Sequence, residues 1–248
     1  MTAAQIAPPH DASLHGHLVD GVIRYIGLAT AFWFVIMVVV LLVASIFHRA
    51  GRSQALYTHG NSRRHYVLAA FVASAIFLGI DMVTLVRSSG DLRRVFWNYP
   101  AANADTLRVE VTAQQWAWTF RYAGADGAFN TPDDIVTLND LHVPVDRPVY
   151  LKLRSKDVVH SFYLPNFRAK VDAIPGNETR LWFVAREPGK FEIGCAQHCG
   201  VSHYKMRGEL TAASPEDYRR WVDSAAADSA LRYDPADPGL YDGWDWGS

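Results

Sequence analysis

Residues 194–208 read GCAQHCGVSHYKMRG and bring together side chains that bind soft metal ions. The only two cysteines of the chain, Cys195 and Cys199, are followed by His203 and Met206. Thiolate, imidazole and thioether donors select copper or zinc over calcium or magnesium. A structural zinc site normally takes four cysteine or histidine ligands, whereas a thioether is a common weak axial ligand of copper. The donor set therefore favours copper.

The pair of cysteines bears on how many copper ions would bind. A mononuclear blue-copper site uses one thiolate and would leave the second cysteine without a role. Two thiolates that bridge two copper ions would both be used, and such a pair needs a second imidazole besides His203. His160, in the run KDVVHSFYLPNFRAKVDAIPG, is the best candidate. Three alternatives stay open at this point: a local disulfide, a structural zinc site and chance spacing.

Two apolar segments near the start of the chain predict membrane-spanning helices. Residues 25–47 contain no charged side chain, and residues 66–86 contain one acid, Asp81. A helix rises about 1.5 Å per residue, so each segment is long enough for the ~30 Å hydrocarbon core of a bilayer. We expect a hairpin of two spanning helices; the alternative for the second segment is a buried core helix.

The basic residues indicate how the hairpin is oriented. Four arginines lie between the two apolar segments, whereas Arg24 alone precedes the first, beside Asp11 and Asp20. The positive-inside tendency places the connection in the cytoplasm and both ends outside. The N-terminus lacks the basic region of a cleaved signal peptide, so we expect the first helix to serve as the insertion signal.

Residues 105–211 have the rhythm of an all-β domain, with short runs bounded by Gly, Pro, Asn and Asp. The stretch DTLRVEV places apolar residues on one face, and WAWTFRY continues in the opposite phase. A change of phase within one strand predicts a bulge near Gln114 and Gln115. RPVYLKLRS and TRLWFVA alternate as further strands, with a turn at EPGK between strands.

The chain is expected to end in a helix and an irregular tail. Ser214 is followed by a proline and two acids, which is typical of a helix start, and the helix should run to about Leu231. The tail DPADPGLYDGWDWGS is rich in Asp, Gly and Pro. We expect four segments: an N-terminal arm at 1–22, the helix hairpin at 23–90, the metal-binding domain at 91–212, and the terminal helix and tail at 213–248.

With these motifs in hand, the sequence resembles subunit II of the haem–copper oxidases, the cytochrome c oxidase family, over about residues 20–211. The family pattern D-V-x-H-S-F/W matches at Asp157, His160 and Ser161. The pattern C-x3-C-x3-H-x2-M matches at Cys195, Cys199, His203 and Met206. The runs DAIPG (172–176) and QWAWTF also match. The resemblance implies a two-helix transmembrane hairpin and an all-β, cupredoxin-like Greek-key sandwich.

The resemblance also implies a binuclear copper centre, CuA, and its ligands. Cys195 and Cys199 would bridge two copper ions. His160 and Met206 would complete one copper, and His203 and the backbone carbonyl of Gln197 the other. Trp116 would be the entry point for electrons; its alternative role is that of a core aromatic.

The implied function is that of the electron-entry subunit of a terminal oxidase in a bacterial inner membrane, with the copper domain in the periplasm. Electrons would pass from cytochrome c to haem in subunit I, and the complex would reduce O2 to water and pump protons. Haem would lie only in the partner subunit. The alternatives are the copper subunit of a nitric-oxide reductase or a membrane-tethered copper carrier.

Charge and two departures from the family pattern refine these expectations. A net charge of −1 gives no reason to expect nucleic acid as a partner. Asp126, Asp133 and Asp134 lie in one loop that could contribute to an acidic docking face. Gln197 stands where many members have glutamate, so we expect no tightly held magnesium from this chain. The second helix begins with SRRHYVLAAF and lacks the glutamate of many members.

Overall fold

The computed structural model describes residues 8–48, 60, 62–101 and 105–232. The chain forms two compact units: Leu18–Trp97, and Met1–His17 together with Asn98–Ser248. The tail that was predicted to be irregular, residues 233–248, lies outside the described residues. The two units are described separately below.

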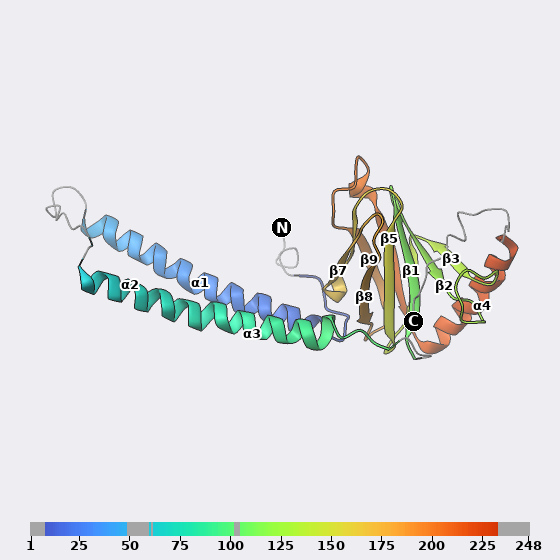
Figure 1. The fold of residues 1–248 in the computed structure, drawn as a ribbon, viewed down its shortest axis with the longest axis horizontal. Coiled ribbons are helices and arrows are strands. Elements are labelled where there is room, and N and C mark those ends of the chain that lie inside the picture. Colours follow the sequence, from blue (N-terminus) through green and yellow to red (C-terminus); the bar gives the residue numbers. More distant parts are fainter. Residues whose placement is uncertain (1–7, 49–59, 61, 102–104, 233–248) are drawn as a thin grey trace. The chain divides into compact units, whose positions relative to one another are not determined.

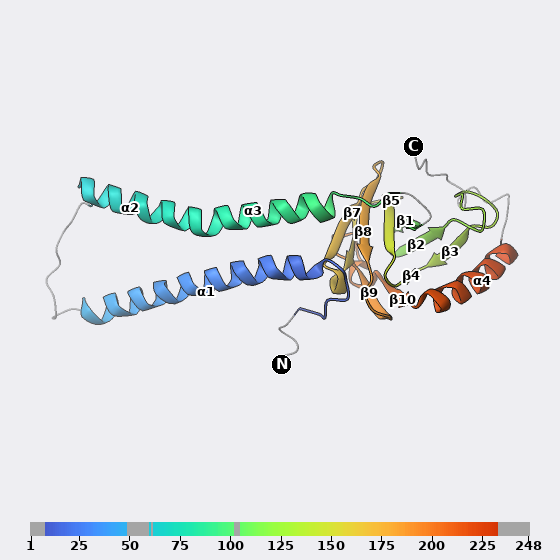
Figure 2. The same ribbon diagram turned by 90° about the horizontal axis from the view of Figure 1, so that it is seen from below.

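The first unit is a pair of antiparallel helices (Figures 1 and 2). The first helix is α1 (Gly16–Phe47). The second runs without a break through α2 (Arg63–Ile76), a π-helical stretch η2 (Phe77–Asp81), α3 (Met82–Asp91) and a second π-helical stretch η3 (Leu92–Phe96). Both are long and apolar enough to cross a membrane, as the sequence predicted. The Tyr25 hydroxyl donates a hydrogen bond of 2.5 Å to the carbonyl of Gly79 in the π-helical stretch.

The second unit is a sandwich of two five-stranded sheets (Figure 1). One sheet has the strand order β3-β2-β1-β5-β8 and the other β4-β10-β9-β6-β7. The strands are β1 (Leu107–Gln114), β2 (Ala117–Tyr122), β3 (Ile135–Leu138), β4 (Asp140–Pro144), β5 (Pro148–Ser155), β6 (His160–Leu164), β7 (Ala169–Ala173), β8 (Thr179–Val184), β9 (Gly189–Cys195) and β10 (Arg207–Ala213). Short 3-10 helices follow β6, at Pro165–Phe167, and precede β10, at His203–Lys205. The predicted sandwich and helix hairpin are both confirmed.

Alternating side chains from both sheets fill the space between them. Val109 and Val111 of β1 are fully buried, as are Leu151 and Leu153 of β5, its parallel neighbour. Phe162 of β6 faces them from the other sheet and makes an edge contact of 5.2 Å between ring centroids with Trp118. Each fully buried side chain of this size contributes roughly 1.5–3 kcal/mol to folding, so the core rigidly fixes the strand ends.

The bulge predicted near Gln114 and Gln115 is wrong. The chain instead reverses there in a two-residue hairpin, in which Gln114 pairs with Ala117 and Ala113 with Trp118. A two-residue turn pairs odd-numbered with even-numbered residues, so the buried face shifts phase without a bulge. The turn projects Trp116 beyond the ends of β1 and β2.

Two terminal segments pack onto the sandwich. The predicted helix is confirmed as α4 (Pro215–Arg232), and its first turn is capped by the Ser214 hydroxyl, which accepts from the Asp217 N–H at 3.1 Å. Trp221 of α4 stacks on His142 with ring centroids 4.2 Å apart. At the other end, Ser13 of the N-terminal arm forms a β-bridge with Ala185. The arm is therefore bound to the β domain.

Candidate metal centre

The predicted ligands lie at one edge of one sheet, where β9 ends and its two neighbours, β6 and β10, begin. His160 is the first residue of β6 and Cys195 the last of β9; Phe162 pairs with Cys195 between these strands. Met206 directly precedes β10, whose first residue, Arg207, pairs with Gly194. The loop 196–206 connects β9 to β10 and supplies the remaining donors (orange, at the top of the β domain in Figure 1). The register of β6, β9 and β10 thus positions the site.

The sulfur of Cys199 is central to the donor atoms. Its Sγ lies 3.8 Å from Cys195 Sγ, 3.5 Å from His203 Nδ1 and 3.7 Å from Met206 Sδ. His160 Nδ1 is 3.1 Å from Met206 Sδ. The backbone oxygen of Gln197 is 3.2 Å from Cys195 Sγ. Both cysteines are free thiols, so the disulfide alternative does not describe this structure.

Asp157 fixes the orientation of the His160 ring. Its Oδ1 lies 2.9 Å from His160 Nε2, which leaves Nδ1 facing the sulfur atoms. The same carboxylate accepts hydrogen bonds from the backbone N–H groups of Gln115, at 2.6 Å, and Val158, at 2.7 Å. Burial alone would raise the pKa of Asp157, but these hydrogen bonds together hold that pKa below its ordinary value. A charged carboxylate behind a ligand histidine is a recurrent outer partner at metal sites.

Three of the donor residues are buried and two are half-buried. His160, Cys199 and Met206 are at most 2% exposed, whereas Cys195 and His203 are half-buried. The ring of Trp118 packs edge-on against the His160 ring, with the ring centroids 6.1 Å apart. Burial, and next the hydrogen bond from Cys195, raises the pKa of the Cys199 thiol to about 11. A thiol with this pKa keeps its proton at neutral pH, and metal binding would have to displace that proton.

The turn between β1 and β2 lies against the ligand loop. Gln115 Nε2 donates to the carbonyl of Cys199 at 2.8 Å, and Trp116 Nε1 donates to the same carbonyl at 3.3 Å. A Cβ atom on Gly200 would lie 2.8 Å from the Gln115 amide and 3.4 Å from the Trp116 ring. Gly200 has φ +119°, and it allows this close approach. Trp116 remains 38% exposed.

The structure brings together all the residues that the sequence singled out as ligands, and it sets Trp116 beside them. His198 lies outside this group: it is exposed, and its ring stacks on His203 at 5.6 Å. The residue that sequence reasoning missed is Gln115. It connects the Asp157 loop to the cysteine loop, yet nothing in the sequence marks a glutamine in a hairpin turn as such a link.

The donor set fits copper better than zinc. Two thiols, two imidazole Nδ1 atoms and a thioether converge here, and the thioether is a poor ligand for zinc but an ordinary one for copper. The ligand atoms of His160, Cys195 and Cys199 all lie within 4.8 Å of one another. The two cysteines, together with His160 and His203, would hold the metal most strongly.

The chain is similar to known proteins of one family. Residues 107–212 match the family "Cytochrome C oxidase subunit II, periplasmic domain". The "Alternative cytochrome c oxidase subunit 2" of Bradyrhizobium diazoefficiens is 33% identical over 222 residues, which are 77% of this chain and 76% of that protein. The cytochrome c oxidase subunit 2 of Cereibacter sphaeroides is 26% identical, over 84% of this chain and 75% of that protein.

Among solved structures, the periplasmic domain of subunit II of cytochrome oxidase from Bradyrhizobium japonicum is similar, with a TM-score of 0.46 and 27% identity. The match covers 53% of this chain and 99% of that domain. Three observations lead to one assignment: the family match, the alignment over 76% of the Bradyrhizobium diazoefficiens protein, and the donor set that favours copper. This chain belongs to the subunit II family of cytochrome c oxidases, the electron-entry subunits of the haem–copper oxidoreductases.

Proposed function

We propose that the chain holds the binuclear copper centre CuA and receives electrons for a terminal oxidase. Cys195, Cys199, His160, His203, Met206 and the backbone carbonyl of Gln197 would hold the two copper ions. The observation that carries the proposal is the position of Cys199 Sγ, which is within 3.8 Å of the other cysteine, of an imidazole nitrogen and of the thioether. A sulfur in that position supports a shared thiolate.

Copper bound there supplies one-electron redox chemistry. The protein contributes a rigid frame, because three hydrogen-bonded strand ends and the dry core hold the donors in place. Asp157 keeps the His160 ring in one orientation. The Met206 thioether and the Gln197 carbonyl are weak donors that would tune the redox potential of the bound copper. These features suit electron transfer rather than chemistry on a bound substrate.

Trp116 is the residue through which electrons enter in this proposal. Its side chain is partly exposed, and its indole N–H donates a hydrogen bond to the Cys199 carbonyl. The donor is cytochrome c or a similar small protein, and the acceptor is haem in subunit I. Reduction of O2 to water and proton pumping are activities of the assembled complex, and membership of the subunit II family supports this assignment.

The chain is proposed to cross a bacterial inner membrane twice, with both termini and the copper domain in the periplasm. Leu14 N–H donates to the carbonyl of Val184 at 3.1 Å, and Ala12 and Arg186 form a further backbone hydrogen bond at 2.9 Å. The arm that precedes α1 is therefore bound to the β domain that follows α3. Segments bound to one another lie on one side of the membrane, which supports two crossings.

Metal analysis and electron paramagnetic resonance test the proposal. The full chain in detergent should bind two copper ions, and the oxidised site should show one unpaired electron shared by both. Cys195→Ser and Cys199→Ser should each abolish that signal, whereas Ser202→Ala, in the same loop but without a proposed metal role, should keep it. A single copper, or an electron confined to one copper, would refute a binuclear centre. Ready exchange of copper with a chelator would favour a carrier instead.

A further inference from the structure

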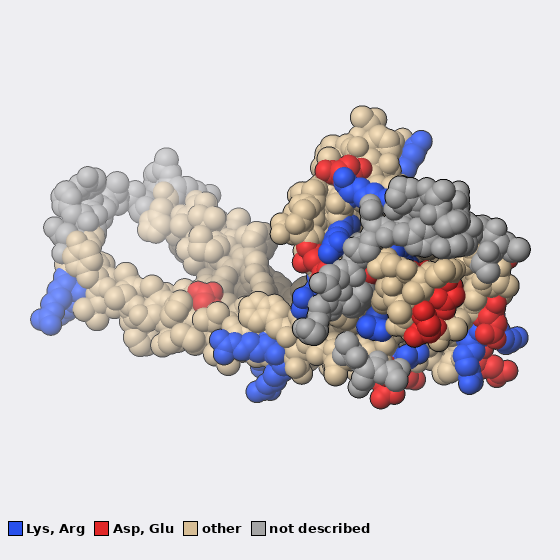
Figure 3. Space-filling view, turned by 45° about the vertical axis from the view of Figure 1, so that its right-hand side comes forward, with Lys and Arg blue, Asp and Glu red and all other residues tan. Residues whose placement is uncertain are grey.

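An apolar surface surrounds Trp116 at the copper end of the β domain. We call it the copper rim and define it as residues 115–116, 156–159 and 196–206. Its exposed large apolar side chains are Trp116, Val158, Val201 and Tyr204, with exposures of 38%, 38%, 87% and 68%. In Figure 3 the tip of the β domain is largely tan, and blue and red atoms are more frequent below it. An exposed apolar cluster of this kind marks a contact surface.

The charges of the copper rim are mainly basic. Its sequence contains Lys156, Lys205 and two histidines but a single acid, Asp157. Both lysines are exposed, and neither makes an ion pair with any residue that the structure describes. Lys205 extends over the Tyr204 ring at 5.5 Å. Asp157 is already committed, because it accepts two backbone hydrogen bonds and contacts His160.

The acids near the copper rim that the structure describes include Glu178, Glu192 and Asp172, and Asp172 lies 3.8 Å from Lys170. Glu178 contacts Lys152 at 3.1 Å, Arg154 at 3.4 Å and Arg180 at 3.7 Å. In a separate pair, Arg207 lies 3.3 Å from Glu192. Each of these acids therefore has at least one cation beside it.

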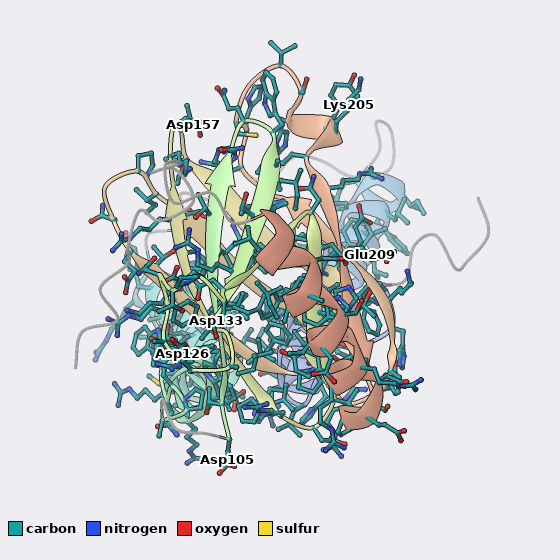
Figure 4. The ribbon with its side chains drawn as sticks, turned by 90° about the vertical axis from the view of Figure 1, so that its right-hand side faces the viewer. Asp105, Asp126, Asp133, Asp157, Lys205 and Glu209 are labelled. Carbon is teal, nitrogen blue, oxygen red and sulfur yellow. The ribbon has the colours of Figure 1, made fainter. Side chains whose placement is uncertain are left out.

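The acidic loop that the sequence suggested for docking lies elsewhere. Trp116 immediately precedes β2, and the loop with Asp126 and Asp133 follows the far end of this six-residue strand. A strand of that length separates its ends by about 17–20 Å. Figure 4 shows Asp157 and Lys205 near one end of the domain and Asp126 and Asp133 well away from it. The acidic loop therefore does not belong to a face around Trp116.

We propose that the copper rim docks an electron-donor protein whose contact face is apolar, with a neutral or acidic border rather than a ring of lysines. The inference rests on the proposed electron-entry function and adds the chemistry of the partner. Apolar contact provides the adhesion, and Lys156 and Lys205 attract acids of the donor. A lysine-ringed donor would meet like charges, which slow association and are relieved by salt.

The test compares charge reversals at and away from the rim in the copper-loaded full chain in detergent. The rim variant is Lys156→Glu/Lys205→Glu. The control, Lys190→Glu/Arg219→Glu, makes the same change in net charge at two exposed positions outside the rim. The probe is a c-type cytochrome with a lysine-ringed haem edge. Its affinity and its rate of copper reduction are measured at low and at moderate salt.

At low salt we expect the rim variant to bind this cytochrome more tightly than the wild type does, and its copper to be reduced several-fold faster. The control should be close to the wild type. For the wild type, the rate of copper reduction should increase or stay constant as the salt concentration increases. A wild-type rate that is high at low salt and falls steeply with salt would overturn the proposal, as would equal effects of both variants. If dithionite but no cytochrome reduces the copper, the entry function fails, and the binding data alone decide the nature of the rim.

Discussion

The indole N–H of Trp116 donates a hydrogen bond of 3.3 Å to the backbone carbonyl of Cys199. The two residues are 83 positions apart in the chain. One edge of the ring is exposed, and the other contacts the residue that is proposed to bridge both copper ions. This single hydrogen bond links the surface of the domain to the centre of the donor set.

Removal of the indole should slow electron entry without disturbing the metal. For Trp116→Ala we expect the reduction rate to fall by about tenfold or more, equivalent to at least about 1.4 kcal/mol in the barrier. Stopped-flow reduction by cytochrome measures this rate, and Trp182→Phe on β8 is the control. A collapsed copper spectrum in Trp116→Ala would show instead that the ring is a structural part of the site.

Met206→Leu should retain copper and raise the redox potential. Leucine fills a similar buried volume but donates no electron density, so the oxidised metal loses more stabilisation than the reduced metal. Redox titration of the copper absorption bands measures the change. An unchanged potential with normal copper content would show that Met206 is not a ligand.

Asp157→Asn should weaken copper binding by about 10- to 100-fold, because His160 loses the charged partner that fixes its ring. Competition with a chelator measures the affinity. The chain has a matched control in Asp140→Asn, since Asp140 contacts His142 at 3.0 Å outside the donor set. Equal losses in both variants would mean that the effect is one of general stability.

Gln197 should give no tightly held magnesium. Its side chain is exposed and carries an amide, and hard divalent cations favour carboxylates. Cells grown with manganese in place of magnesium allow a test by electron paramagnetic resonance on the purified complex. A stoichiometric, chelator-resistant manganese signal that disappears in Gln197→Ala would contradict this prediction, whereas its appearance only in Gln197→Glu would support it.

Both ends of the chain should be accessible from the periplasm. Epitope tags at the N-terminus and the C-terminus should be cleaved by protease in cells with a permeable outer membrane. A tag inserted after Gly60, between the helices, should be protected. Cleavage of the Gly60 tag under the same conditions would show that the hairpin has the opposite orientation.

The local sequence determined much of this protein. Cys195, Cys199, His203 and Met206 lie close together in the sequence. Their short separation along the chain keeps these donors near one another even without contacts to distant segments. Long apolar runs specify the two helices, and alternation specifies the strands. The phase change after Gln114 does not distinguish a bulge from a two-residue hairpin, because both shift the buried face in the same way.

Tertiary structure decided the contacts between distant segments. His160 reaches the sulfur atoms because β6 pairs with β9 in one register, and Gln115 reaches both Asp157 and Cys199 because the β1–β2 turn lies over the ligand loop. The acidic loop is removed from Trp116 by the length of β2. Such placements depend on strand register and sheet packing between residues far apart in the chain, which local periodicity does not encode.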